Sequence, residues 1–76
     1  MNKHCYKIQL NTMTDVRKFI EKTALIEEGT ILTLSDGGHY SINASSIMGV
    51  LYSLEWNHLY LYSTTEVYSI FADFII

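Results

Sequence analysis

Nine residues in the middle of the chain, Asn43-Ala44-Ser45-Ser46-Ile47-Met48-Gly49-Val50-Leu51, place hydroxyl side chains directly before an apolar run. Ser45 or Ser46 can accept hydrogen bonds from the free N–H groups at the start of a helix. The apolar side chains that follow fall within one helical turn and a half. The stretch therefore predicts a short helix with its own N-cap and one apolar face.

The segment just before this helix has the pattern of a β-hairpin. Residues 30–35 and 39–43 flank Asp36-Gly37-Gly38, and the glycines allow the positive φ angles that tight turns require. These two segments are predicted to pair as antiparallel strands.

Two further segments alternate between residue types with the period of a strand. In residues 4–10, Tyr6, Ile8 and Leu10 share one face. In residues 59–63, leucine alternates with tyrosine, which predicts leucines facing inward and tyrosines facing outward or at an edge. Both segments are predicted to be half-buried strands.

Apolar residues also recur at helical spacing in two places. Thr14 is a good N-cap for a helix that begins near Asp15 and buries Val16, Phe19 and Ile20. Near the other end, Ser63-Thr64-Thr65-Glu66 has the form of a capping box. The stripe expected on the last helix comprises Val67, Ile70, Phe71 and Phe74.

The predicted element order is β-α-β-β-α-β-α, which is typical of an α+β fold with helices on one face of a single sheet. The strands are too few and the connections too short for a doubly wound parallel sheet. A length of 76 residues with 49% hydrophobic residues is too short for two cores and too apolar for disorder. A single domain over residues 1–76 is expected.

The net charge of −3 argues against a nucleic-acid-binding protein, but the charges are unevenly distributed. All five Lys and Arg residues lie among the first 22 residues, with two carboxylates, whereas the remainder holds six carboxylates and no Lys or Arg. The first helix is therefore the one basic feature of an acidic chain. It is either an ordinary solvated face or a docking surface for an acidic partner.

Several other classes of site have no support in the sequence. His4, His39 and His58 lie far apart and lack nearby ligands at metal-binding spacing, so no metal or cofactor is expected. Cys5 has no partner for a disulfide and no sign of an activated thiolate. With no signal-like or membrane-spanning segment, a cytoplasmic protein without membrane contact is expected. The tyrosines and Trp56 either form an exposed aromatic surface or pack in the core and at its rim.

The stretch Ser46-Ile47-Met48-Gly49-Val50 resembles the regulatory-serine region of the HPr family. These small histidine-containing phosphocarriers belong to the sugar phosphotransferase system, which carries out sugar transport in low-GC Gram-positive bacteria. The resemblance covers nearly the whole chain, because the predicted elements fall where the family places them. It implies an HPr-like open-faced β-sandwich, in which one antiparallel four-stranded sheet is covered on one face by three helices.

One part of the family pattern is missing. The phosphoryl-accepting histidine of the family lies in a Gly-x-His-x-Arg-Pro motif, and the matching stretch here is Met13-Thr14-Asp15-Val16-Arg17-Lys18. Asp15 stands in the histidine position. The chain therefore looks like an HPr fold without histidine carrier chemistry, and no enzymatic activity is expected.

Asp15 admits three interpretations. As a first-turn carboxylate it stabilises the helix dipole. As a permanent negative charge it imitates phosphohistidine in part, since a phosphoryl group brings about two charges. As an acyl-phosphate acceptor it would act as a carrier itself, chemistry that generally needs a divalent metal. Arg17, with the hydroxyls of Thr12 and Thr14, either is solvated or binds an anion.

Ser46 can act both as an N-cap and as a regulatory phosphorylation site, as the resemblance implies. The interpretation that follows is a regulatory or protein-binding module acting through the Ser46 helix. The residues expected to contact a partner are Ile47, Met48, Leu51, Val16 and Ile20. By analogy, the partner is a phosphotransferase-system component, HPr kinase or a transcriptional regulator. The alternatives are a phosphocarrier with a non-histidine acceptor and a passive structural or oligomerising module. A monomer is expected, with a weak dimer as the alternative.

Overall fold

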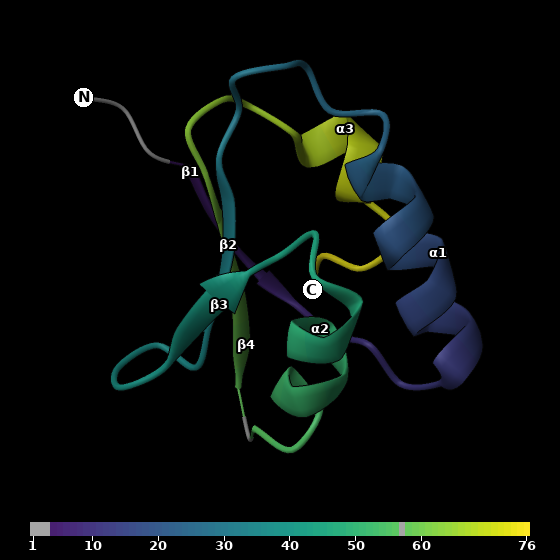
Figure 1. Cartoon of the computed structure of the whole chain (residues 1–76), viewed down its shortest axis with the longest axis vertical. Helices are drawn as coiled ribbons and strands as arrows, with labels where there is room; N and C mark the ends of the chain where they lie inside the picture. Colours follow the sequence, from purple (N-terminus) through teal and green to yellow (C-terminus); the bar gives the residue numbers. More distant parts are fainter. Residues whose placement is uncertain (1–3, 57) are drawn as a thin grey trace.

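The structure of the chain is a computed structural model, which describes residues 4–56 and 58–76. Its elements are β1 (His4–Ile8), α1 (Met13–Thr23), β2 (Leu32–Ser35), β3 (Ser41–Asn43), α2 (Ile47–Ser53), β4 (Leu59–Ser63) and α3 (Tyr68–Phe71). The predicted order β-α-β-β-α-β-α is confirmed. The three helices lie together on one side of the sheet (Figure 1).

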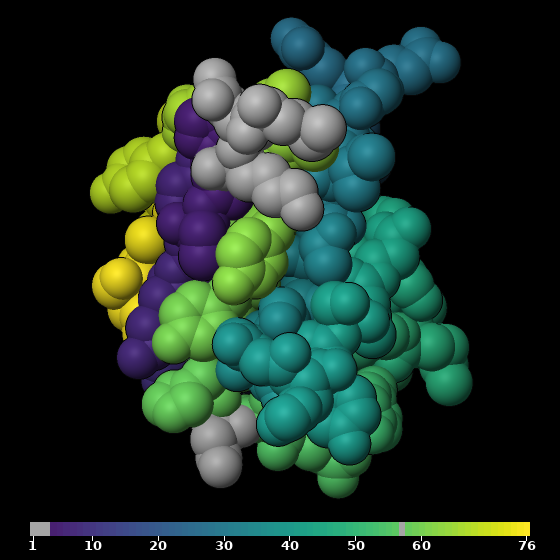
Figure 2. Space-filling view, turned by 90° about the vertical axis from the view of Figure 1, so that its left-hand side faces the viewer, coloured from purple at the N-terminus to yellow at the C-terminus, as the bar shows by residue number. Residues whose placement is uncertain are grey.

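All strand pairs of the four-stranded sheet are antiparallel, and the spatial order is β1-β4-β2-β3. β4 lies between β1 and β2, with Leu61 opposite Tyr6 on one side and Leu34 on the other. The prediction of an α+β fold with one antiparallel four-stranded sheet and three helices is thus confirmed. The face of the sheet that carries no helix is open (Figure 2).

Alternation along the strands separates the two faces of the sheet, as predicted. Leu59 and Leu61 are buried, whereas Tyr60 and Tyr62 are partly exposed. Leu32 and Leu34 of β2 follow the same rule. Since successive side chains in a strand point to opposite faces, the leucines supply the surface on which the helices pack.

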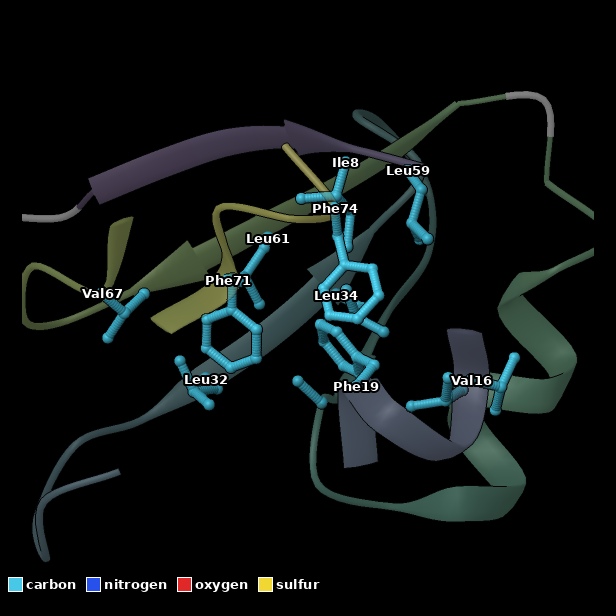
Figure 3. Packing of buried hydrophobic residues seen from close by; sticks show 12 residues of the cluster. Ile8, Val16, Phe19, Leu32, Leu34, Leu59, Leu61, Val67, Phe71 and Phe74 are labelled. Atoms are coloured by element: carbon cyan, nitrogen blue, oxygen red, sulfur yellow. The ribbon is translucent and has the colours of Figure 1, made fainter. Parts of the chain in front are cut away.

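The core lies between this surface and the helices. Phe19 of α1 packs against Phe71 and Phe74, with ring centroids 5.1 and 5.8 Å apart (Figure 3). Val16 and Val50 are buried as well, one from α1 and one from α2. The helices are therefore held by buried side chains rather than by their own propensity, as expected for elements of 4 to 11 residues.

The hairpin between β2 and β3 forms where the sequence predicts it. Gly37 has a φ of 94°, which favours glycine. Asp36 Oδ1 accepts hydrogen bonds from the N–H groups of Gly38, His39 and Tyr40 at 2.9, 2.9 and 3.1 Å. These bonds, above all the one from Gly38, lower the pKa of Asp36. The carboxylate therefore organises the turn.

The last helix differs from its prediction. Ser63 is the final residue of β4, and Val67 precedes α3 without a side-chain cap, so the predicted capping box is wrong. The helix ends at Phe71 because the chain beyond it turns and pairs with β1: Ile75 forms a β-bridge with Ile8, and the Ile76 N–H donates to the Lys7 carbonyl at 3.0 Å. The burial expected of the apolar stripe is confirmed for Val67, Phe71 and Phe74, and Ile70 is partly buried, but only Ile70 and Phe71 lie within α3.

Glu66 has a different role from the predicted cap. Its carboxylate accepts hydrogen bonds from the hydroxyl of Tyr6 and from the N–H of Tyr68, and the Tyr6 hydroxyl accepts one from the N–H of Val67. Burial, aided by the charge of Glu66, raises the pKa of Tyr6. These bonds tie β1 to the start of α3.

In the part of the chain described, no helix is long and apolar enough to cross a membrane.

Candidate functional site

A groove of about 400 Å³ runs between α1 and α2. Its lining residues are Met13, Thr14, Val16, Arg17, Ile20, Glu21, Ile47 and Leu51. Four of the five residues predicted to contact a partner thus line one surface, namely Val16, Ile20, Ile47 and Leu51. They come from stretches about 30 residues apart, which the fold brings side by side (Figure 1).

The predicted contact residues differ in what they offer to a partner. Ile47 is 56% exposed and Met48 is 74% exposed, but Met48 does not line the groove. Val16 is 1% exposed and belongs to the core, so it supports the groove rather than presenting surface. Ile47 is therefore the most accessible apolar anchor of α2 within the groove.

Met13 and Glu21 also line the groove, and sequence reasoning missed both. Met13 lies before the Thr14 cap that the sequence predicts, but it is the first residue of α1 and is well exposed. Its spacing of seven residues from Ile20 was the available signal, because residues i, i+3, i+4 and i+7 share a helix face.

The two walls of the groove differ in charge. α1 contributes Arg17 and Glu21, and Lys18 is exposed on the same helix. α2 has the sequence Ile-Met-Gly-Val-Leu-Tyr-Ser and contains no charged residue. The groove therefore has one uncharged, largely apolar wall and one wall that carries charges of both signs.

The N-terminus of α1 is closed by its own side chains. Thr12 is the N-cap, and its Oγ1 accepts a hydrogen bond from the Asp15 N–H at 3.1 Å. Asp15 Oδ2 in turn accepts one from the Asn11 N–H at 2.9 Å. The prediction of Thr14 as the cap is wrong, because Thr12 is placed where its hydroxyl reaches an N–H of the first turn and Thr14 already lies within the helix.

The hydrogen bonds at the N-terminus of α1 leave little support for the anion site predicted at Arg17, Thr12 and Thr14. Thr14 and Arg17 line the groove, whereas Thr12 is engaged with the Asp15 N–H. The carboxylate of Asp15 lies in the first turn, where it meets the positive end of the helix dipole. An external anion at this end of α1 would meet that negative charge. Asp15 thus has the helix-stabilising role that is the simplest of its three interpretations.

The N-terminus of α2 is capped by Ser46, whose Oγ accepts a hydrogen bond from the Gly49 N–H at 3.2 Å. Ser45 is held differently, since both its N–H and its hydroxyl donate to Asn43 Oδ1. Of the two serines that the sequence leaves open as caps, Ser46 is the cap. Its side chain is exposed, and the first turn of α2 contains no acidic residue.

Gly49 allows α2 to lie close to the hairpin. A Cβ atom built on Gly49 would lie 2.8 Å from Ile42 Cδ1 and 3.4 Å from Ile42 Cβ. The glycine after Met48 therefore has a packing role that the sequence pattern alone does not show.

The remaining candidate residues are spread over the molecule. Within residues 4–56 and 58–76, no three His, Cys, Asp or Glu side chains form a group that could hold a metal ion. Cys5 is an exposed free thiol opposite Tyr62 in the sheet. Its proximity raises the pKa of the Tyr62 hydroxyl.

Searches against family models, curated proteins and solved structures found no match for this chain. The resemblance to the HPr family thus stays a prediction from the sequence.

Proposed function

We propose that this chain is a non-enzymatic, HPr-like protein of the bacterial cytoplasm that regulates the sugar phosphotransferase system by binding another protein. The groove between α1 and α2 carries this proposal, because four of the five residues predicted to contact a partner line it. The element order, which is the order that the resemblance implies, adds support. Asp15 replaces the carrier histidine and acts in the proposal only as a helix-stabilising charge.

The partner that fits the groove is an amphipathic protein segment with acidic residues beside its apolar anchors. Apolar side chains of the partner would contact Ile47, Leu51 and Ile20. Its carboxylates would meet Arg17 and Lys18 on the basic helix α1. By analogy with the family, such a segment belongs to a transcriptional regulator or a phosphotransferase-system component.

Phosphorylation of Ser46 by HPr kinase is the regulatory step in this proposal. The Ser46 hydroxyl already faces the Gly49 N–H, and the first turn of α2 carries no acidic side chain. A phosphate at a helix N-terminus gains from free N–H groups and from the dipole. It would also place about two negative charges directly before Ile47, at the edge of the groove.

Mass spectrometry of the intact protein tests the regulatory step. One sample is incubated with ATP and HPr kinase, and another with phosphoenolpyruvate and Enzyme I. A phosphate gained from ATP alone is expected, absent in Ser46→Ala and retained in Ser45→Ala. A hydroxylamine-sensitive phosphate gained from phosphoenolpyruvate and absent in Asp15→Asn would instead make Asp15 a carrier. No phosphate from either source would contradict the regulatory role of Ser46.

A second experiment tests the groove. Ile47→Asp places a charge on the apolar wall and is expected to weaken binding of a purified candidate regulator at least about tenfold in calorimetry. Leu25→Asp is the matched control, because Leu25 is also an exposed apolar residue but lies outside the groove. Equal affinities for the two variants would overturn the groove as the docking site. Light scattering of the free protein shows whether the groove instead binds a second copy of the chain, since the measured mass would then rise with concentration.

A further inference from the structure

A second cavity, away from the groove between α1 and α2, combines an aromatic ring with negative charge. It has a volume of about 310 Å³ and is lined by Asp36, Glu55, Trp56 and His58. This volume lies at the lower end of the range for small-molecule sites. Asp36 comes from the β2–β3 hairpin and the other three residues from the connection between α2 and β4. Hairpin and connection meet at the lower end of the molecule (Figure 2).

Two tyrosines hold the indole ring of Trp56 in place. Tyr40 of the hairpin stacks on it, with ring centroids 6.1 Å apart and an interplanar angle of 15°. Tyr52 of α2 meets it edge to face at 6.2 Å and 85°. Both tyrosines are more than half exposed, whereas Trp56 packs in part against the core and reaches the surface at the cavity that it lines. The face of an indole ring is the strongest aromatic site for a cation in proteins.

The carboxylate of Asp36 lines the same cavity as this ring and is held by the hairpin turn. One of its oxygens accepts the three N–H groups of the hairpin turn, and these bonds keep the group ionised by lowering its pKa. Among the residues that the structure describes, its other oxygen has no hydrogen-bond partner. Glu55 adds a second carboxylate to the same cavity.

The chain offers no Lys or Arg near these carboxylates in the sequence, since none follows Lys22. The one ion pair found within the described residues joins Lys22 to Asp73, which lie elsewhere. The cavity thus has an aromatic wall and two carboxylates with no Lys or Arg near them in the sequence. The basic groups close to them are two histidines, His39 beside Asp36 and His58 in the cavity lining.

We propose that this cavity binds an organic cation, an ammonium or guanidinium group that stacks on Trp56 and is neutralised by Asp36 and Glu55. A metal ion fits less well, because within the described residues Asp36, Glu55 and His58 do not come together as a metal-binding group. An organic cation suits carboxylates that are spread around a ring, since its charge is distributed over several atoms and its methyl or methylene groups contact the ring face.

Fluorescence titration tests this proposal directly, because Trp56 is the only tryptophan of the chain. The probes are choline and arginine amide, and the neutral control is 3,3-dimethyl-1-butanol, which has the shape of choline without its charge. Sodium chloride keeps the ionic strength constant. A saturable change in emission with either cation, and none with the neutral alcohol, is expected. A stronger response to choline assigns the site to quaternary ammonium ligands, and a stronger response to arginine amide assigns it to basic side chains.

Variants locate the binding within the cavity. Glu55→Gln and Asp36→Asn are each expected to raise the dissociation constant about two- to fivefold, since each removes one charge at a partly exposed site. The amide introduced by Asp36→Asn keeps an oxygen that can accept the turn hydrogen bonds, so the hairpin persists. Glu28→Gln is the matched control, because Glu28 is an exposed glutamate that lines a different cavity. An equal response to the neutral alcohol, or unchanged affinity in both cavity variants, would overturn the proposal.

Discussion

Helices α1 and α2 begin in the same way, yet they differ in charge. In each, a hydroxyl accepts a hydrogen bond from the N–H three residues later: Thr12 from Asp15 at 3.1 Å and Ser46 from Gly49 at 3.2 Å. At α1, the residue in that third position carries a carboxylate, which accepts a further bond from Asn11. At α2, the same position is a glycine.

This difference shows where a new negative charge can be accommodated. The positive end of the α1 dipole already faces a carboxylate, so a second anion there would meet repulsion. The corresponding end of α2 has no acidic residue in its first turn. A phosphate on Ser46 would therefore provide at α2 what Asp15 provides at α1.

The largest effect is expected from the buried face of α1. Phe19→Ala removes a fully buried ring that contacts Phe71 and Phe74, and should lower the free energy of unfolding by about 3–5 kcal/mol. Urea unfolding followed by circular dichroism measures this loss. Ile47→Ala, on the exposed face of α2, should cost less than about 0.5 kcal/mol. If Phe19→Ala cost no more than loss of a cap, α1 would not be held by its buried face.

Loss of the α1 cap is expected to have the next largest effect. Thr12→Ala removes the acceptor for the Asp15 N–H and should cost about 1–2 kcal/mol in the same unfolding experiment. Thr12→Ser keeps the hydroxyl and should recover most of the loss. Thr14→Ala is the matched control, with an expected cost within about 0.5 kcal/mol, because Thr14 is exposed and does not cap the helix. A larger loss for Thr14→Ala than for Thr12→Ala would contradict the assigned cap.

The cap of α2 should contribute somewhat less. Ser46→Ala is expected to cost about 1 kcal/mol, and Ser45→Ala less, since Ser45 bonds only to Asn43. Ser46→Asp keeps a cap acceptor and adds the negative charge that α2 lacks, so its stability should match or exceed that of the parent. A loss in Ser46→Asp as large as in Ser46→Ala would mean that the N-terminus of α2 does not favour negative charge.

The caps also show which features the sequence could predict. Element types and the core followed from apolar periodicity, because a period of two or of 3.6 residues decides which face is buried. The exact cap of α1 did not follow, because Thr12 and Thr14 are equally good cap residues locally. The missed signal was Asp15 three residues after Thr12, a spacing that resembles a capping box.

Local sequence patterns do not predict the features that depend on contacts between residues distant in the sequence. The apolar stripe at the end of the chain was predicted, but α3 stops at Phe71 because the following segment bonds to β1. The partner-binding residues were predicted singly, whereas the groove requires the placement of α1 beside α2. The cavity at Trp56 requires the hairpin to meet a connection about 20 residues later, which local patterns do not encode.

The smallest effect concerns the hairpin, where a carboxylate again accepts backbone N–H groups, as at α1 and unlike α2. Hydrogen bonds from Gly38 and Tyr40 lower the pKa of Asp36 in the folded protein, whereas in the unfolded chain this carboxyl has its ordinary pKa of about 3.9. Asp36 therefore contributes stability above that ordinary value, and the contribution is lost as the pH falls through the lowered folded pKa.

Comparing urea midpoints at about pH 5 and about pH 2.5 tests this linkage. The parent protein should lose more stability on acidification than Asp36→Asn, because the amide keeps an acceptor oxygen but cannot be protonated in this range. Other carboxylates titrate in both proteins and cancel in the comparison. An equal loss in the two proteins would show that the N–H groups of the hairpin do not distinguish a charged acceptor from a neutral one. Since phosphorylated Ser46 would also act through charge on backbone N–H groups, that result would weaken the argument for α2 as well.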